Sequence, residues 1–142
     1  MKAIRSPRFI QIVLATGFTV GVIAASSATD IKVKLTGDQE VPAVATAAAG
    51  AGTIVIKADR SVTGSIKTVG MAGTMAHIHL AEPGKNGASI ITLEKTADNT
   101  WSVPEGAKLT DDQYKSFKDG NLYVNVHSDA HKGGEIRTQL KP

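Results

Sequence analysis

Short runs in which apolar and polar residues alternate dominate this sequence, and glycine or other turn-forming residues interrupt nearly every run. In the run 30–36, Ile31, Val33 and Leu35 alternate with lysine and threonine. Successive residues of a β-strand point to opposite faces, so a period of two predicts a strand with one buried face. Comparable runs predict further strands at 52–58, 62–69, 74–80, 88–94, 122–127 and 135–140.

One short helix is expected after Thr110. Thr110 and Gln113 have the spacing of a capping box, in which each side chain bonds the backbone N–H of the other residue. Leu109 and Tyr114 occupy the positions of a hydrophobic staple, and Gly120 is placed to end the helix in a left-handed conformation. This helix is the exception in a chain that otherwise predicts strands.

The pattern predicts an all-β fold, an immunoglobulin-like or Greek-key β-sandwich or barrel with one short helix. The alanine-rich stretch 43–51 and the stretch 96–106 are expected to be loops. The chain has no cysteine, so a disulfide, a thiolate nucleophile and a cysteine-ligated metal are all excluded. A metal site would have to use histidine, carboxylate, methionine or backbone oxygen.

Residues 1–28 have the organisation of a secretory signal peptide. Three basic residues precede a largely apolar run at 9–25, and small residues up to Ala28 suit a cleavage site. A retained membrane anchor is the alternative, because the apolar run is about long enough to span a bilayer. We expect cleavage after Ala28, leaving one domain at 29–142 that is periplasmic or secreted.

The charge of the chain is concentrated in that first segment. Three of the 16 Lys and Arg residues and none of the 13 acidic residues lie in 1–28, so 29–142 carries 13 of each sign and is formally neutral. A neutral domain gives no reason to expect nucleic acid or an anionic membrane surface as partner. After cleavage the domain is expected to have no membrane attachment.

All four histidines fall in two short motifs. His77 and His79 lie two residues apart in one predicted strand and therefore share a face, and His127 and His131 lie at the end of another. If these strands are neighbours, the four imidazoles can converge on one ion. Imidazole suits copper and zinc, so we predict a metal site of His77, His79, His127 and His131, with copper first and zinc second. Met75 is a weaker candidate for a soft ligand.

Three functional hypotheses follow. In the first, the domain binds, stores or handles a metal ion without catalytic turnover. In the second, the histidines form hydrogen bonds across strands or to Asn125, and the domain is a metal-free adhesion or interaction module for an unknown protein partner. The third is a redox enzyme resembling Cu/Zn superoxide dismutase, but the sequence lacks the zinc loop of that enzyme. Enzymatic activity is therefore uncertain and disfavoured.

Other polar residues have less defined roles. Glu135 and Arg137 alternate with Ile136 and are expected to form a solvated or ion-paired strand face. Glu40 either caps a turn or reaches the site.

Three motifs stand out along the chain: the segment 35–42, the segment 77–80 with Gly84 and Gly87, and the segment 120–127 leading to 134–137. Together they resemble the CHRD domain family, which is named from chordin. The similarity extends over essentially all of 29–142. The resemblance implies an immunoglobulin-like β-barrel and an extracytoplasmic location, as in the stand-alone secreted bacterial members. It implies no particular reaction, so the function has to be argued from the residues.

Overall fold

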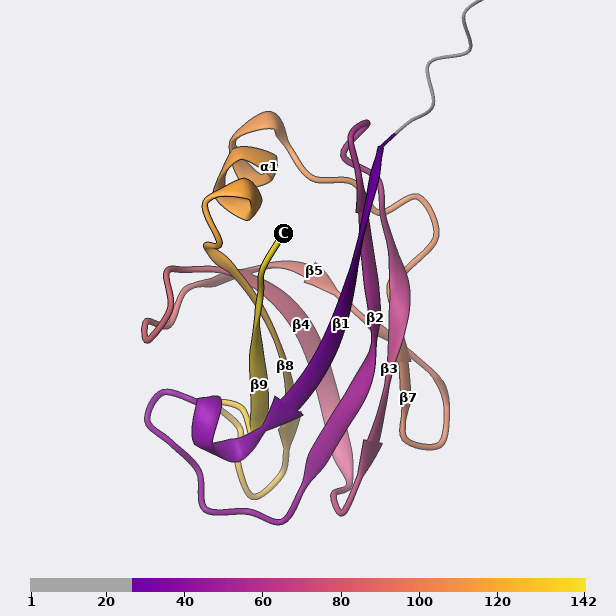
Figure 1. Ribbon diagram of the computed structural model, residues 1–142. Helices are drawn as coiled ribbons and strands as arrows, with labels where there is room; N and C mark the ends of the chain where they lie inside the picture. Colours follow the sequence, from indigo (N-terminus) through magenta and orange to yellow (C-terminus); the bar gives the residue numbers. More distant parts are fainter. Residues whose placement is uncertain (1–26) are drawn as a thin grey trace, which may run out of the picture.

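The computed structural model describes residues 27–142, an antiparallel β-barrel with one short α-helix (Figure 1). The predicted all-β class is confirmed. All but the last two residues of the predicted signal peptide lie outside the described residues. The elements are, in chain order, β1 (Ala28–Thr36), the 3-10 helix η1 (Gly37–Gln39), β2 (Ala49–Lys57), β3 (Val62–Val69), β4 (Gly73–Leu80), β5 (Ala88–Thr92), β6 (Glu94–Ala97), β7 (Thr100–Ser102), α1 (Asp111–Lys118), β8 (Leu122–Ser128) and β9 (Ile136–Leu140).

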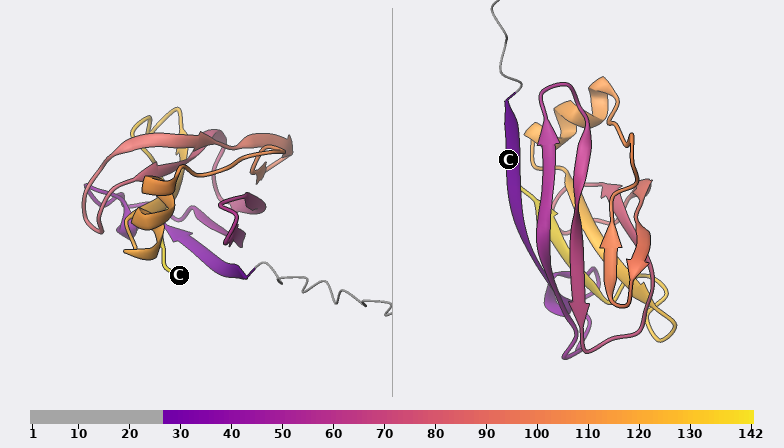
Figure 2. Two further views of the ribbon diagram at one scale, coloured as in Figure 1. Left: turned by 90° about the horizontal axis from the view of Figure 1, so that it is seen from above. Right: turned by 90° about the vertical axis from the view of Figure 1, so that its right-hand side faces the viewer.

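The sheet closes on itself through a single extended segment. The strand order is β5-β4-β8-β9-β1-β2-β3-β7-β6, so the two ends of the order are strands that follow one another in the chain. Only Leu93 separates β5 from β6, and its N–H donates to Ala76 O of β4 at 2.9 Å. The segment 88–97 therefore pairs with β4 through its first half and with β7 through its second, which closes the barrel (Figure 2).

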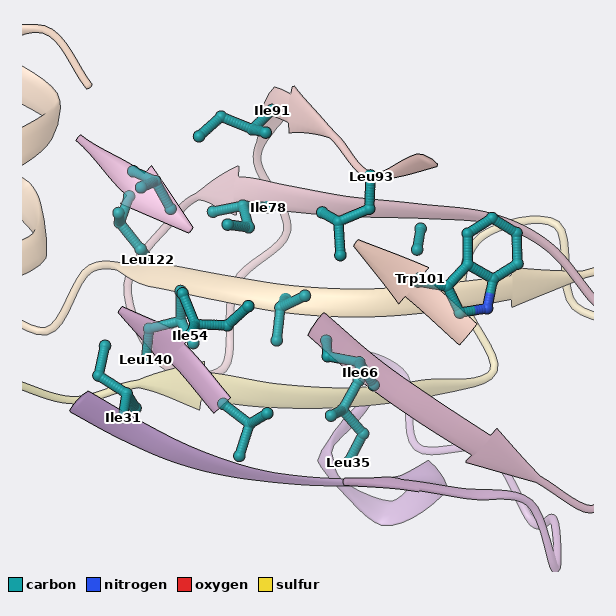
Figure 3. Packing of buried hydrophobic residues seen from close by; sticks show 14 of the residues in the cluster. Ile31, Leu35, Ile54, Ile66, Ile78, Ile91, Leu93, Trp101, Leu122 and Leu140 are labelled. Atoms are coloured by element: carbon teal, nitrogen blue, oxygen red, sulfur yellow. The ribbon is translucent and has the colours of Figure 1, made fainter. Parts of the chain in front are cut away.

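The predicted alternation places the core inside this barrel. Ile31, Val33 and Leu35 of β1 are buried, whereas Lys32 and Lys34 are exposed. The buried side chains of the other strands meet them in the barrel interior (Figure 3). Each such aliphatic side chain contributes roughly 1.5–3 kcal/mol when it is fully buried. The interior is thus an aliphatic core with Trp101 of β7 as its largest aromatic member.

Two stretches that were expected to be loops contain strands. Strand β2 begins inside the alanine-rich stretch 43–51, and β7 lies inside 96–106. Strands β2 and β3 approach so closely that a Cβ atom at Gly52 would lie 2.0 Å from Ser65 O, and one at Gly64 would lie 2.1 Å from Thr53 O. Small residues permit this approach, and because they lack large apolar side chains they also erase the alternation by which a strand is recognised.

The predicted helix start is confirmed in detail. Thr110 Oγ1 accepts from the N–H of Gln113 at 3.2 Å, and Gln113 Oε1 accepts from the N–H of Thr110 at 2.9 Å. Leu109 and Phe117 are buried, so the helix packs onto the barrel at the end where β1 begins (Figures 1 and 2). Among the described residues, no helix has the length and apolar character needed to cross a membrane.

Replacing the capping threonine tests the contribution of the capping box to stability. We expect Thr110→Ala to lower the free energy of unfolding by about 1 kcal/mol, because it leaves helix N–H groups without a partner. Lys115→Ala is the matched control, since it changes an exposed side chain of the same helix. Urea denaturation followed by circular dichroism measures both variants, and equal stabilities would contradict the assigned cap.

Candidate metal centre

Strands β4 and β8 are neighbours, and their register brings the two histidine motifs together. His77 lies opposite Asn125, and His127 lies opposite Met75, in an antiparallel pair. Ala76 and Ile78 point into the barrel, so the histidines lie on its outer side. The potential ligand atoms of His77, His79 and His127 all lie within 4.8 Å of one another. The structure thus groups three of the four predicted ligands.

The tautomer of His79 is fixed by a backbone carbonyl. Its Nδ1 lies 2.9 Å from Gly87 O, and a carbonyl oxygen only accepts, so Nδ1 carries the hydrogen. The lone pair of the neutral ring is then on Nε2, which is buried and has no hydrogen-bond partner among the described residues. A backbone carbonyl on one imidazole nitrogen is the usual arrangement behind a metal-binding nitrogen.

His127 is oriented in the same way. Its Nδ1 lies 2.9 Å from Lys132 O, which leaves the lone pair on Nε2. This Nε2 is 3.0 Å from His77 Nδ1, so His77 donates a hydrogen bond to His127. When the single hydrogen of the neutral His77 ring moves to its other nitrogen, two lone pairs face each other across that distance.

The separations suit a single ion. Nitrogen ligands about 2.0–2.1 Å from one metal are roughly 2.9–3.4 Å apart for bond angles between square-planar and tetrahedral. The 3.0 Å between the nitrogens of His77 and His127 lies in this range. All the ligand atoms of the group lie within 4.8 Å of one another, so a side-chain movement of at most roughly 1.5 Å would bring every pair into this range.

Tyr123 of β8 stacks against His79. The two rings are nearly parallel, with centroids 4.7 Å apart and an angle of 3° between their planes. The guanidinium of Arg137 lies over the same tyrosine ring, with its Cζ 3.4 Å from the centroid. Strand β8 lies between β4 and β9, so His79 and Arg137 approach Tyr123 from its two sides. This stack holds the plane of the His79 ring.

The expectation of a solvated or ion-paired strand face for Glu135 and Arg137 is wrong, because both are buried and neither forms an ion pair within the described residues. Their exposed fractions are 7% and 2%. Arg137 donates to Asn86 Oδ1 at 3.1 Å and to Lys85 O at 2.8 Å, and Glu135 accepts from Thr46 at 2.7 Å. Both residues are covered because loops that are distant in the sequence fold over the outer face of β8 and β9.

The two covering loops are joined to each other. Asn86 Nδ2, in the loop between β4 and β5, donates to Val41 O, in the loop after η1, at 2.6 Å. Glu40, next to Val41, is thereby buried with an exposed fraction of 6%. Its role, which the sequence left open, is to extend beneath these loops into a covered polar layer that includes Asn125 and Arg137.

Burial raises the pKa of Glu40, while the charge of Arg137 and a hydrogen bond with Asn125 oppose the rise. Gly134 makes this arrangement sterically feasible, because a Cβ atom there would lie 2.4 Å from Glu40 Oε1 and 2.6 Å from Asn125 Nδ2. Glu40 Oε1, Asn125 Oδ1 and His79 Nε2 are buried acceptors without a hydrogen-bond partner in the described part of the chain. Buried acceptors of this kind require a donor or a cation.

The histidines are poised to be neutral. Burial lowers the pKa of His77 from its ordinary value of 6.5, and the charges of His127 and His79 lower it further. Burial also lowers the pKa of His79, while its hydrogen bond to Gly87 partly opposes the shift. Neutral imidazole is the form that binds metal, so both side chains are in the binding form near neutral pH.

His131 and Met75 lie differently from the other predicted ligands. His131 is in the turn after β8 and is not in the group of three histidines. Its backbone carbonyl accepts from Ser128 at 3.3 Å and from Gly134 at 3.0 Å, which shapes the turn that presents Lys132 O to His127. Its role as a ligand stays a prediction. Met75 is on the histidine strand and is 47% exposed.

Sequence reasoning missed the residues that orient the ligands. The carbonyls of Gly87 and Lys132 have no signature, because every residue carries one. Asn125 and Tyr123 were recognisable in part, since they alternate with Val124 and Val126 and share the face of His127.

The fold and the site define an antiparallel β-barrel with a candidate histidine metal centre on its outer side. The family model of the CHRD domain matches residues 31–140. The chain therefore belongs to the CHRD domain family, as the three motifs suggested. Neither the comparison with curated proteins nor the comparison with solved structures gave a match.

The lowered pKa values make the metal-free fold sensitive to acid. In the unfolded chain His77 and His79 bind protons below about pH 6.5, whereas the folded chain resists protonating them. The unfolded state then holds more protons, so the free energy of unfolding should fall as the pH drops from about 7.5 to about 5.5. Urea denaturation of chelator-treated protein measures this dependence, and a His77→Gln/His79→Gln variant should show less of it. An equal slope in the variant would contradict the assignment.

Proposed function

We propose that this CHRD domain binds one transition-metal ion through His77, His79 and His127 and acts in binding, storage or handling of that metal. The observation that carries the proposal is the pair of backbone carbonyls that hold Nδ1 of His79 and of His127. Both rings therefore present Nε2 lone pairs, and on His79 that atom has no partner among the described residues. Most buried polar side-chain atoms have a hydrogen-bond partner, so the unpaired Nε2 of His79 points to a missing ligand.

Copper is the first candidate for the ion and zinc the second. A given set of nitrogen and oxygen ligands binds Cu²⁺ more tightly than Zn²⁺. Three imidazoles offer nitrogen ligands, and Asn125 Oδ1, on the residue opposite His77, is a buried oxygen acceptor without a hydrogen-bond partner among the described residues. The set contains no thiolate, because the chain has no cysteine. We further propose that the domain works outside the cytoplasm, which rests on the signal-like character of residues 1–28.

Substituting the ligands tests the proposal directly. We expect chelator-treated protein to bind copper saturably in isothermal titration, and His77→Gln, His79→Gln or His127→Gln to weaken binding by at least about 100-fold. The reason is that losing the hydrogen-bond partner of a metal ligand already lowers metal affinity roughly 10–100-fold, and losing the ligand itself lowers it more. Absence of saturable binding in the parent protein would refute the proposal.

Two further variants serve as comparisons. Lys132→Ala is the matched control, because its exposed side chain is lost while the carbonyl that orients His127 remains. It should keep the affinity of the parent protein. His131→Gln tests the fourth predicted ligand, and we expect a smaller loss than for the three grouped histidines. A loss as large as that of His127→Gln would make His131 a ligand.

The metal-free interaction module is the main rival. The hydrogen bond between His77 and His127 favours it, because that contact satisfies both atoms without an ion. Under this hypothesis the histidine variants lose stability but the parent protein shows no saturable metal binding. The titration therefore separates the two hypotheses.

A superoxide-dismutation assay tests the enzymatic hypothesis. We expect copper-loaded protein to be no more active than the same concentration of free copper, because the proposed role is binding without turnover. Activity above that level that is lost in His127→Gln would contradict this expectation and favour a redox enzyme.

A further inference from the structure

The barrel has an open seam between β1 and β9. These strands are neighbours in the sheet but share only the residue pair Thr36–Arg137. The rest of β1 pairs with β2 alone, and the rest of β9 pairs with β8 alone. Figure 1 shows the two strands together at the end of β1 and apart toward the C-terminus. Over most of its length, β1 therefore presents an unpaired edge to the seam.

The backbone groups on this edge can be identified by alternation. In an antiparallel pair, each residue directs its N–H and C=O to one side, and the next residue directs them to the other. Ser27 O accepts from the N–H of Ala58, which follows β2, at 2.8 Å, so the odd-numbered residues of β1 direct their backbone N–H and C=O groups toward β2. The backbone N–H and C=O groups of Asp30, Lys32 and Lys34 then face the seam. Lys34 O accepts there from the Gln39 side chain at 3.2 Å, which agrees with this assignment.

A cleft of about 750 Å³ opens along the same seam. This volume lies in the range of ligand pockets, about 300–1,000 Å³. Its lining on the β1 side includes Asp30, Lys32 and Lys34, and its lining on the other side includes Gln139 and Lys141. Lys34 and Lys141 form no ion pair within the described residues. The cleft therefore combines free strand edges with an excess of positive charge.

We propose that the open edge of β1 binds an extended segment of a partner protein in which acidic and apolar residues alternate. Such a segment adds a strand to β1 through backbone hydrogen bonds, the recognition mode known as β-augmentation. Its acidic side chains lie beside Lys32 and Lys34 on the outer face, at the short distances of cross-strand neighbours. Its apolar side chains continue the inner face formed by Ile31 and Val33.

A peptide is favoured over other anionic partners by the backbone groups. A sulfated polysaccharide or a nucleic acid satisfies lysine charges equally well, but it offers no regular series of N–H and C=O groups to a strand edge. The formal neutrality of residues 29–142 also argues against a general attraction to polyanions. The inference is independent of the metal centre, so its test is carried out with chelator present.

The probe is a synthetic peptide of alternating glutamate and valine, blocked at both ends, added to the isotope-labelled protein and followed by NMR. We expect saturable shifts of backbone amides in β1, with the largest at Asp30, Lys32 and Lys34. Lys34→Glu/Lys141→Glu should weaken binding by at least about tenfold, because it reverses one positive charge on each wall of the cleft. Lys67→Glu/Lys95→Glu is the matched control, since it reverses two exposed charges outside the cleft and should change affinity less than about twofold.

A second peptide separates strand addition from charge attraction. The same sequence with N-methyl groups on alternate amides keeps every charge but loses hydrogen-bond donors on one edge. Placing the methyl groups on either edge in turn should give one peptide that binds at least about tenfold more weakly and one that binds almost normally. Equal binding of all three peptides, or shifts that heparin reproduces at the same residues with higher affinity, would overturn the proposal.

Sedimentation of the protein alone measures whether it dimerises. Dimerisation that is blocked by Lys34→Glu/Lys141→Glu would overturn the proposal and assign the edge to a second copy of the chain.

Discussion

Strand β8 is buried on both of its faces, and the candidate site depends on this constraint. Leu122, Val124 and Val126 face the aliphatic interior, while Tyr123 and His127 face outward under a cover of loops. Polar groups without access to water need partners within the protein. The loops provide them, and in doing so they fix the positions of the histidines. Ordering of the site is thus a consequence of covering a polar strand face.

The covered layer contains more acceptors than donors. Glu40, Asn125 and His79 each contribute a buried acceptor atom without a hydrogen-bond partner in the described residues, although Arg137 lies nearby as a cation. The guanidinium directs its hydrogen bonds to the loop 81–87 and to Gln139, and it acts on Glu40 only through its charge. A bound cation would offset this imbalance at His79 and Asn125, and the metal proposal gains physical support from that.

Membership of the CHRD domain family fixes the fold more firmly than the role. The family match covers nearly all the described residues, and the barrel agrees with it. Barrel closure is nevertheless uneven. The segment 88–97 closes one junction completely, whereas β1 and β9 meet at a single residue pair. The metal centre lies on β4 and β8, and the seam lies between β9 and β1, with Arg137 of β9 bordering both.

Local sequence determined the elements of this protein. The alternation of Ile31, Val33 and Leu35 predicted a strand and its buried face, and the Thr110–Gln113 spacing predicted the helix start, because both signals act over a few residues. The two-residue spacing of His77 and His79 likewise placed them on one face. Where side chains are small, as at Ala49 and Gly50, this local signal disappears, and the start of β2 was expected to be a loop.

Only the tertiary structure decided which histidines meet and what surrounds them. The pairing of β4 with β8 joins residues about 50 positions apart, and no local pattern specifies that register. Arg137 looked like a solvated strand residue because its alternation with Ile136 describes the strand but not the loops that cover it. Carbonyls such as Gly87 O and Lys132 O occur at every residue, so their role as orienting groups exists only once the chain has folded.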